Sequence, residues 1–324
     1  MIRSQVKDLI IEEFGVNHIF AANVASKIDQ SVKKSDEIKS FFINFYKNKP
    51  KPFVKWVGGK RQLLKQFKTL GFYPPDHFDA ESATYFEPFV GGGAVFFDLL
   101  PQSAVLSDWN GELVITYNVI KDDVEKLIES LKVHKNEKEY FLDMRAKDLS
   151  ELSDVEVASR FIYLNRTCFN GMYRVNKSGG FNVPFGKQKN PLICDEDNLR
   201  KVSAILENVN ISKRDYRDVL KDARKGDFIY FDPPYYPLNK TSSFTSYTAD
   251  GFLEKEQQEL RDTYFELHKK GCFVMLSNSN TEFIRDLYSD LDDKIKINEV
   301  SASRMINSVA SKRGKIKEVL VVNY

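Results

Sequence analysis

Residues 84–108 read TYFEPFVGGGAVFFDLLPQSAVLSD. Residues 84–90 are mostly aromatic or apolar and stop at three glycines, a pattern typical of a buried strand that ends in a tight turn. Residues 94–100 change to helical spacing, and residues 104–107 form a second apolar run that ends at Asp108. This strand, turn, helix and second strand predict an α/β fold with a doubly wound, largely parallel sheet.

Further strand patterns occur at residues 209–212, 227–231 and 272–277, and residues 294–300 and 316–324 predict two strands around a long polar turn. Between the second and third strands, the apolar residues of 113–165 have helical spacing, so a module is inserted into the sheet. Residues 1–50 also have helical spacing and end at Lys49-Pro50-Lys51-Pro52, where two prolines stop a helix. These patterns predict a helical extension of unknown role at 1–50, a sheet domain at 51–112 and 209–324, and an inserted domain at 113–208.

Composition narrows the class of protein. The 324 residues include 48 lysines and arginines against 46 acidic residues, a net charge of +2, which excludes binding of polyanions by bulk charge alone. Three cysteines far apart exclude a disulfide scaffold and offer no Cys-x-x-Cys metal pair. No apolar run of about 18 residues occurs and the amino terminus has no signal-peptide pattern. We therefore expect a soluble intracellular protein whose basic surfaces are local.

The sequence Asp232-Pro233-Pro234-Tyr235 directly follows the predicted strand at 227–231, at the edge where open α/β sheets bind ligands. Two prolines make a stiff turn that presents the Asp232 carboxylate and nearby carbonyls as acceptors, and Tyr235 offers a flat face for stacking. Such a set suits the exocyclic amine of a planar base. A β-turn with prolines for rigidity is the alternative, but the preceding strand and the following tyrosine favour the chemical role.

A cofactor loop is predicted at residues 87–93, between a strand and a helix, because glycines let a ligand approach the backbone and the helix amino terminus supplies N–H donors. Asp108 ends the next strand and could accept hydrogen bonds from two ribose hydroxyls. The pattern is neither Gly-x-Gly-x-x-Gly nor a Walker lysine loop, so a methionine-bearing nucleoside fits better than a dinucleotide. Upstream, Trp56 could pack on the cofactor and Lys60 could neutralise its carboxylate. A buried tryptophan and a surface lysine are the alternative.

Two stretches, residues 157–194 and 301–317, lack acidic residues although 46 of the 324 residues are acidic. In the first, the turn at 176–180 lies between residues 172–175 and 181–183, which predicts a basic β-hairpin with interleaved aromatic residues. Its lysines could meet phosphates, and an arginine could bind guanine O6 and N7 in the major groove. The second stretch lies in the turn between the last two predicted strands. Two basic loops suggest a nucleic-acid cleft, and solvated basic surfaces are the alternative.

Six segments together resemble the Dam-type DNA adenine-N6 methyltransferases (D12 class, alpha group). They are 53–60 (FVKWVGGK), 86–93 (FEPFVGGG), 163–166 (YLNR), 169–171 (FNG), 181–186 (FNVPFG) and 232–235 (DPPY). The resemblance runs from about residue 51 to the end and leaves residues 1–50 unmatched. It implies a Rossmann-like, S-adenosylmethionine-dependent methyltransferase sheet as catalytic domain, and an inserted helical and β-hairpin domain that recognises the DNA target.

The residue patterns and the resemblance together predict three sets of site residues. The catalytic positions are Asp232, Pro233, Pro234 and Tyr235. The cofactor positions are Trp56, Lys60, Glu87, Phe89, Gly91, Asp108, Asp215 and Asp232. The DNA-binding positions are Phe169, Asn170, Met172, Arg174, Asn176, Lys177, Pro184, Lys187, Arg304, Lys312 and Arg313. Within the last set, Arg174 matches the arginine that reads the guanine of GATC, and Phe169 stands where an aromatic residue, often tyrosine, inserts into the duplex.

The resemblance implies transfer of a methyl group from S-adenosylmethionine to adenine N6 in double-stranded DNA, at GATC, with base flipping and with S-adenosylhomocysteine as product. No metal is expected, because the donor is already a sulfonium. The alternatives are a longer GAT-containing site, a cytosine-N4 methyltransferase, and a non-catalytic DNA-binding protein; Asp232 favours adenine, since cytosine-N4 enzymes more often carry Ser-Pro-Pro. A bacterial or phage enzyme of the cytoplasm, nucleoid-associated and without membrane contact, is expected. A paired restriction endonuclease, the oligomeric state and the host stay open.

Overall fold

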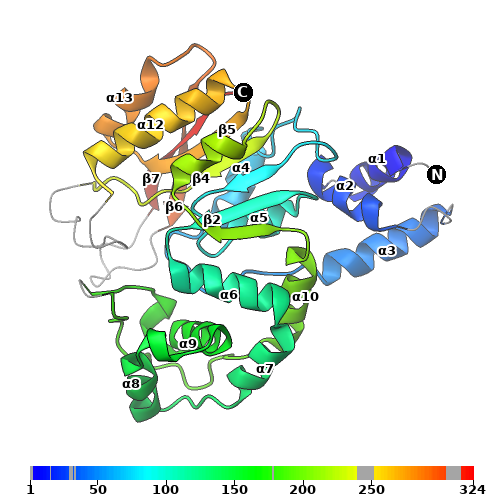
Figure 1. Cartoon of the computed structure of the whole chain (residues 1–324). Coiled ribbons are helices and arrows are strands. Elements are labelled where there is room, and N and C mark those ends of the chain that lie inside the picture. The colour runs from blue at the N-terminus through cyan, green and yellow to red at the C-terminus, as the bar shows by residue number, and fades with distance from the viewer. Residues whose placement is uncertain are drawn as a thin grey trace.

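The computed structural model describes residues 3–14, 16–28, 32, 34–176, 179–238, 252–303 and 315–324. In this part of the chain a seven-stranded sheet has the order β3-β2-β1-β4-β5-β7-β6 (Figure 1). The strands are β1 (Tyr85–Glu87), β2 (Ala104–Asp108), β3 (Asn210–Lys213), β4 (Phe228–Phe231), β5 (Phe273–Ser279), β6 (Lys296–Ser303) and β7 (Lys315–Val322). Strands β1 to β5 pair in parallel, whereas β7 is antiparallel to β5 and to β6. The predicted α/β class and the predicted strands are confirmed.

Side chains of the central strands alternate between two separate apolar cores, because successive residues of a strand point to opposite faces of the sheet. In β4, Phe228 and Tyr230 belong to one core, and Ile229 and Phe231 belong to the other. Both faces are covered, so β4 is a continuous apolar run with no polar residue facing solvent. This double burial places the end of β4 firmly, and with it Asp232.

Helices cover both faces of the sheet. One face packs against α4 (Leu64–Thr69) and α5 (Ala94–Leu99), which contribute buried side chains to the core of Phe228 and Tyr230. The other face packs against α11 (Val219–Asp222), α12 (Glu254–Lys269) and α13 (Glu282–Ser289). None of the helices in the described ranges combines the length and the apolar character that crossing a bilayer would need.

The predicted insertion between β2 and β3 consists of helices that lie below the sheet in Figure 1. They are α6 (Gly111–Asp122), α7 (Val124–Lys132), α8 (Lys138–Ala146), α9 (Asp154–Thr167) and α10 (Glu196–Leu206). A buried ion pair joins the first helix to the fourth, since Arg160 Nη1 lies 2.9 Å from Glu112 Oε2. Arg160 also donates to the carbonyls of Met144 and Arg145, so its whole guanidinium group is held inside this lobe.

Residues 172–183, predicted to form a basic hairpin, contain no regular strand in their described part, which is 172–176 and 179–183. Asn182 N donates to the Arg174 carbonyl and Asn176 N donates to the Gly180 carbonyl. The pairing is limited to isolated bridges at Val175 with Phe181 and at Cys168 with Phe185. The predicted hairpin is thus a short one, with a single antiparallel bridge at its base, and Tyr173 and Phe181 add buried side chains to the core beneath it.

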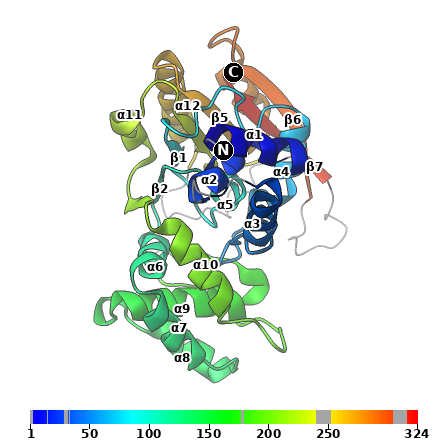
Figure 2. The same ribbon diagram turned by 90° about the vertical axis from the view of Figure 1, so that its right-hand side faces the viewer.

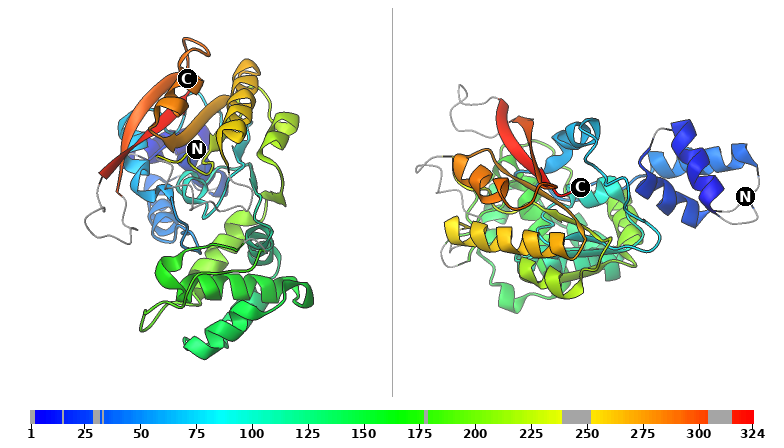
Figure 3. Two further views of the ribbon diagram at one scale, coloured as in Figure 1. Left: turned by 90° about the vertical axis from the view of Figure 1, so that its left-hand side faces the viewer. Right: turned by 90° about the horizontal axis from the view of Figure 1, so that it is seen from above.

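Residues before the sheet form three helices, α1 (Arg3–Phe14), α2 (His18–Lys27) and α3 (Ser35–Lys47), at one side of the molecule (Figures 2 and 3). The helical spacing of this segment thus corresponds to three helices, and the last of them, α3, ends at Lys47, before Pro50. The bundle is docked on the sheet domain through polar contacts. Asn23 Nδ2 donates to the carbonyl of Leu100, and Lys49 Nζ donates to the carbonyl of Asp98. Both acceptors lie at the carboxyl end of α5, where Leu100 has a positive φ of 47°.

We expect Asn23→Ala to lower the free energy of unfolding by about 1–3 kcal/mol, because the Leu100 carbonyl would lose its buried donor. Urea titration followed by circular dichroism measures the loss. Asn48→Ala is the control, since Asn48 makes exposed hydrogen bonds within one helix end. Equal stability of the Asn23→Ala and Asn48→Ala proteins would contradict the importance of this docking contact.

Candidate active site

The predicted site residues converge at the carboxyl ends of β1, β2 and β4. Strands β2 and β3 lie on one side of β1, and β4 lies on its other side. The order of strands along the sheet therefore reverses between β1 and β4. Open α/β sheets bind ligands in the crevice at such a point. The loop after β1 (residues 87–93), Asp108 at the end of β2 and Asp232 after β4 all lie at this edge.

The glycine loop is shaped by Trp56. Gly91 has a positive φ of 47°, and a Cβ atom built there would lie 2.6 Å from the indole ring, so no other residue fits without displacing Trp56. Gly91 N donates to Asp108 Oδ2 (3.0 Å), and Tyr117 OH donates to the Gly91 carbonyl (3.1 Å). The structure therefore brings Trp56, Gly91 and Asp108 together, although they lie far apart in the sequence.

Asp108 is held by the backbone around it. Its Oδ1 accepts a hydrogen bond from Asn110 N (2.9 Å), which complements the bond from Gly91 N to Oδ2. Burial raises the pKa of Asp108, and the two backbone donors oppose that rise. Asp108 as a whole is half-buried, and each oxygen of a carboxylate can accept a further hydrogen bond from a ligand.

Lys60 and Asp232 form a buried ion pair, with Lys60 Nζ 2.6 Å from Asp232 Oδ1. The ammonium group also donates to the Gly58 carbonyl (2.7 Å) and lies 4.8 Å from the centre of the Tyr235 ring. Burial raises the pKa of Asp232 to about 6, and the Lys60 charge keeps it from rising further. The sequence predicted that Lys60 neutralises a cofactor carboxylate; in this structure its carboxylate partner is Asp232.

A third acidic residue, Glu318 of β7, reaches the same site. Tyr235 OH donates to Glu318 Oε2 (2.8 Å), which fixes the ring directly after the two prolines. Glu318 also raises the pKa of Asp232 by charge repulsion. Sequence reasoning missed Glu318, because it lies 83 residues after Tyr235 and inside an ordinary strand pattern.

Glu87 is 2% exposed and lies beneath the glycine loop. Its Oε2 accepts hydrogen bonds from Tyr85 OH (2.8 Å) and from Phe96 N (3.1 Å) in the first turn of α5. Burial is the main cause that raises the pKa of Glu87 to about 8, and the nearby Asp232 contributes. Glu87 is thus mostly protonated at neutral pH and supports the loop from inside the protein.

The remaining cofactor positions lie near the end of β3. Phe89 stacks on Tyr216 with ring centres 5.3 Å apart, which places the predicted loop next to Asp215. The Asp215 carboxylate already pairs with Arg217 (2.8 Å), so it has a protein partner. Ser212 Oγ and Tyr216 OH are buried without a hydrogen-bond partner among the described residues, and a bound nucleoside could satisfy such groups.

Several predicted DNA-binding residues share an exposed surface of the insertion. Phe169, which is 48% exposed, is joined to the exposed Pro184 by a hydrogen bond from its N to the Pro184 carbonyl. Asn170, in the same turn, has a left-handed backbone (φ 57°). Arg174 is exposed, and its Nε donates to Asn182 Oδ1 within the loop. Lys187 and Asn176 are exposed as well and Met172 is half-buried, whereas Lys177, Arg304, Lys312 and Arg313 lie outside the described residues.

Tyr173, which sequence reasoning also missed, ties this surface to the cofactor loop. Its ring stacks on Trp56 with centres 5.7 Å apart and planes 19° from parallel. Its hydroxyl donates to Glu112 Oε1 (2.8 Å), and Glu112 is the partner of the buried Arg160. Tyr173, which precedes Arg174 in the chain, therefore packs directly on Trp56, which shapes the turn at Gly91.

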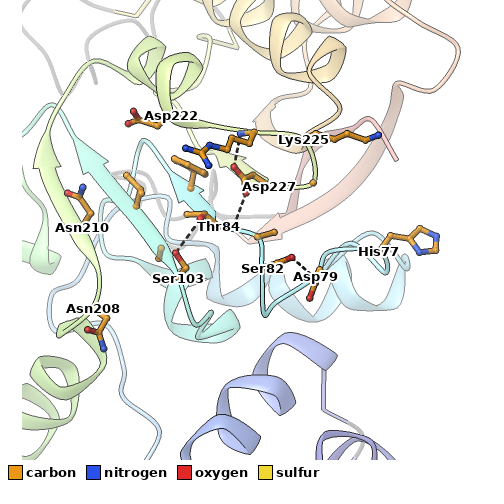
Figure 4. Close-up of a pocket in the computed structure, with 16 residues that line it drawn as sticks. His77, Asp79, Ser82, Thr84, Ser103, Asn208, Asn210, Asp222, Lys225 and Asp227 are labelled. Carbon is orange, nitrogen blue, oxygen red and sulfur yellow. Dashed lines mark hydrogen bonds between the residues drawn. The ribbon is translucent and has the colours of Figure 1, made fainter. Parts of the chain in front are cut away.

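A cavity of about 560 Å³ lies at the opposite, amino-terminal edge of the parallel strands (Figure 4). In it, Asp227 accepts hydrogen bonds from Thr84 N (2.8 Å) and Arg224 N (2.7 Å), so its carboxylate already closes two turns. None of the predicted site residues lines this cavity. The candidate site is therefore the carboxyl edge.

We expect Glu87→Gln to stabilise the protein increasingly as the pH rises from about 4.5 to 8. In that range the native protein keeps a proton on Glu87 that the unfolded chain releases, so rising pH favours unfolding of the wild type by up to about 1.4 kcal/mol per pH unit. Glutamine keeps an acceptor for Tyr85 and Phe96 and has no such proton. Urea titrations at pH 5, 6.5 and 8 measure the effect, with the exposed Glu139→Gln as control. A difference in stability that stays constant with pH would refute the protonated state of Glu87.

The chain is similar to several known methyltransferases. The chain is 46% identical over 282 residues to the type II methyltransferase M1.LlaDCHI of Lactococcus lactis subsp. cremoris, an alignment that covers 85% of this chain and 95% of that protein. It is 44% identical to the type II methyltransferase M.MjaIII of Methanocaldococcus jannaschii, covering 85% of this chain and 99% of that protein. A DNA adenine methylase of Vibrio cholerae is 34% identical, covering 85% and 96%.

The family model for D12 class N6 adenine-specific DNA methyltransferases matches residues 56–306. That range begins at Trp56 and contains the glycine loop, the insertion and the Asp232 turn, whereas α1 to α3 precede it. The seven-stranded mixed sheet is consistent with an S-adenosylmethionine-dependent methyltransferase fold. The chain belongs to the D12 class of N6 adenine-specific DNA methyltransferases.

Proposed function

We propose that this protein transfers the methyl group of S-adenosylmethionine to adenine N6 in double-stranded DNA, at GATC, on a base flipped out of the duplex. The observation that carries the proposal is the position of the Asp232–Lys60 pair beside the Gly91–Asp108 loop, at the change of direction in the sheet. The Gly91–Asp108 loop suits a nucleoside, and the Asp232 carboxylate suits an exocyclic amine. Family membership favours this activity over a cytosine-N4 enzyme and over a non-catalytic DNA-binding protein.

The residues around Asp108 fit the proposed cofactor. Asp108 would accept hydrogen bonds from the ribose hydroxyls, and Phe89 would pack on the adenine ring beside Tyr216, whose buried hydroxyl has no partner among the described residues. Trp56 would line the pocket above Gly91. S-adenosylmethionine supplies a methyl group already activated by its sulfonium charge, so the family implies no metal for this transfer.

Asp232 would accept a hydrogen bond from the target amine and take the one proton that N6 loses when its bond to the methyl group forms and the methyl–sulfur bond breaks. Its pKa of about 6 leaves it mostly ionised at neutral pH and makes it a stronger proton acceptor than an ordinary aspartate. Lys60 holds the carboxylate in place while the amine approaches, and Tyr235, fixed by Glu318, presents its ring for stacking. A fixed acceptor orients the nitrogen lone pair toward the methyl group, and this orientation is where catalysis would come from.

The exposed surface of the insertion would bind the target DNA. Phe169 is a large exposed aromatic side chain on a short turn and would insert into the duplex. Arg174 would read the guanine of GATC, and exposed lysines such as Lys187 would meet phosphates. Relatives named type II methyltransferases make a paired restriction endonuclease part of the proposal, and the bacterial relatives suggest that the enzyme acts in the cytoplasm.

We expect Asp232→Asn to lower kcat at least about tenfold to a hundredfold, as loss of a charged hydrogen-bond acceptor costs about 1.5–3 kcal/mol. The wild-type kcat should fall as the pH drops through about 6, because protonated Asp232 cannot accept a hydrogen, and the variant should lack this decrease. Methylation rates between pH 5.5 and 8 test both points. Asp98→Asn, which weakens another lysine–aspartate pair, is the control. A wild-type profile without a decrease near pH 6 would refute the assignment of Asp232.

We expect Arg174→Ala to lower the preference for guanine at the first base of GATC by about 1–3 kcal/mol, which is about fivefold to 150-fold in the ratio of rates. Methylation rates on GATC, AATC, CATC and TATC duplexes measure the preference. Lys187→Ala is the control and should slow all four duplexes alike, since a phosphate contact carries no base information. An unchanged ratio in the Arg174→Ala protein would mean that the guanine is read elsewhere or that GATC is not the target.

A further inference from the structure

The Asp232 turn is held from behind by two buried amide side chains, Gln257 of α12 and Asn278 at the end of β5. Each is 0% exposed. Gln257 Nε2 donates to the Pro234 carbonyl (3.0 Å), and Gln257 Oε1 accepts from Asn278 Nδ2 (2.9 Å). Asn278 Oδ1 in turn accepts from Tyr236 N (3.2 Å). A chain of hydrogen bonds thus runs from the middle of the turn through both amides to its far end.

The order of donors and acceptors along this chain allows one orientation of each amide. If Gln257 were flipped, its oxygen would face the Pro234 carbonyl oxygen. If Asn278 were flipped, its nitrogen would face the backbone nitrogen of Tyr236 and its oxygen would face the oxygen of Gln257. An unmatched polar group in this dry position is costly, so both amides are locked. The hydrogen bonds link the turn to α12 through Gln257 and link α12 to β5 through Asn278.

The turn needs external donors because Pro233 and Pro234 have no N–H group. Their carbonyls are therefore the groups through which the turn can be held or can bind a ligand. Gln257 engages the Pro234 carbonyl, while the Pro233 carbonyl, next to Asp232, accepts no hydrogen bond within the described residues. The two carbonyls thus have different roles in the same rigid turn.

We propose that Gln257 and Asn278 are positioning residues, which hold the Pro234 carbonyl so that Asp232 and the Pro233 carbonyl face the target amine. This inference rests on the proposed function and adds two residues that do not touch the substrate. A loose turn would still bind DNA and cofactor, because neither binding surface contains these amides. It would misplace the acceptors, and an error of about 1 Å in such positions can lower the rate about a hundredfold.

The test replaces the buried amide by an apolar group of similar length, Gln257→Met. We expect kcat to fall at least about tenfold, with KM for DNA and for S-adenosylmethionine changed less than about threefold. The matched control is Asn323→Leu. Asn323 is another buried amide, which binds the backbone at the opposite end of β5 through Val274 N (2.7 Å) and the Cys272 carbonyl (2.9 Å). Its loss should lower the unfolding temperature and leave kcat unchanged at a temperature where the protein is folded.

A conservative variant, Gln257→Glu, adds a rescue experiment. A protonated carboxyl group can donate to the Pro234 carbonyl and accept from Asn278, whereas an ionised one repels that carbonyl. The ratio of the variant's kcat to the wild-type kcat should therefore rise as the pH falls, and the Gln257→Met ratio should stay flat. Taking the ratio removes the pH dependence that both proteins share through Asp232.

Two results would overturn the inference. Equal losses of kcat in Gln257→Met and Asn323→Leu, in proportion to lost stability, would show that Gln257 is merely structural. An increase of KM with unchanged kcat would show that the turn acts in binding. Wild-type protein that methylates no adenine would overturn the proposed function and this inference together, and that result is distinguishable because it appears before any variant is compared.

Discussion

The ion pair between Lys60 and Asp232 joins two parts of the sequence that are 172 residues apart, and the candidate site is assembled around it. Asp232 is half-buried, and its desolvation favours the protonated form, so a nearby cation is needed to keep the carboxylate ionised. Glu318 adds negative charge nearby, and Glu87 is a second buried carboxyl group whose pKa differs from that of Asp232. Within the described residues no ion pair is formed to Glu87, which is largely neutral at pH 7, whereas Asp232 pairs with Lys60 and stays mostly ionised. Asp232, the group that would face the target amine, is thereby kept as a charged acceptor.

The packing of Trp56 is a second constraint on the same site. Its ring contacts Gly91 and Gly92 on one side and stacks on Tyr173 on another. The cofactor loop, the sheet and the inserted lobe therefore share one aromatic contact, which the buried Glu112–Arg160 pair supports from within the lobe. A shift of the surface that carries Arg174 would have to displace Tyr173. The two proposed functions of the molecule, base recognition and cofactor binding, are thus built on one packed unit.

The amino-terminal segment contacts the carboxyl end of α5, the helix that follows the glycine loop. Asn23 and Lys49 satisfy the carbonyls at the carboxyl end of α5, while Glu87 accepts a hydrogen bond from the first turn of the same helix. Both ends of this six-residue helix are therefore fixed by groups outside it, which a helix too short to be stable alone requires. The bundle precedes residues 56–306, which match the family model, and it supports α5 from outside that range.

The sequence by itself determined the strands, their burial, the helical insertion and the motifs at the strand ends, because periodicity, prolines and glycines act over a few residues. Gly91, Asp108 and Asp232 could be predicted to meet, since each lies at or just after the carboxyl end of a parallel strand. Trp56 lies in a loop, and only its motif indicated that it joins them. The partners of these residues could not be predicted. Gln257 lies in a charged helix, Glu318 lies in a strand of common pattern, and Tyr173 lies in a turn whose neighbours are basic. Which carbonyl Gln257 binds, which acid Lys60 pairs with and which glutamate stays protonated depend on distances between remote segments and on burial, and tertiary structure alone decides these quantities.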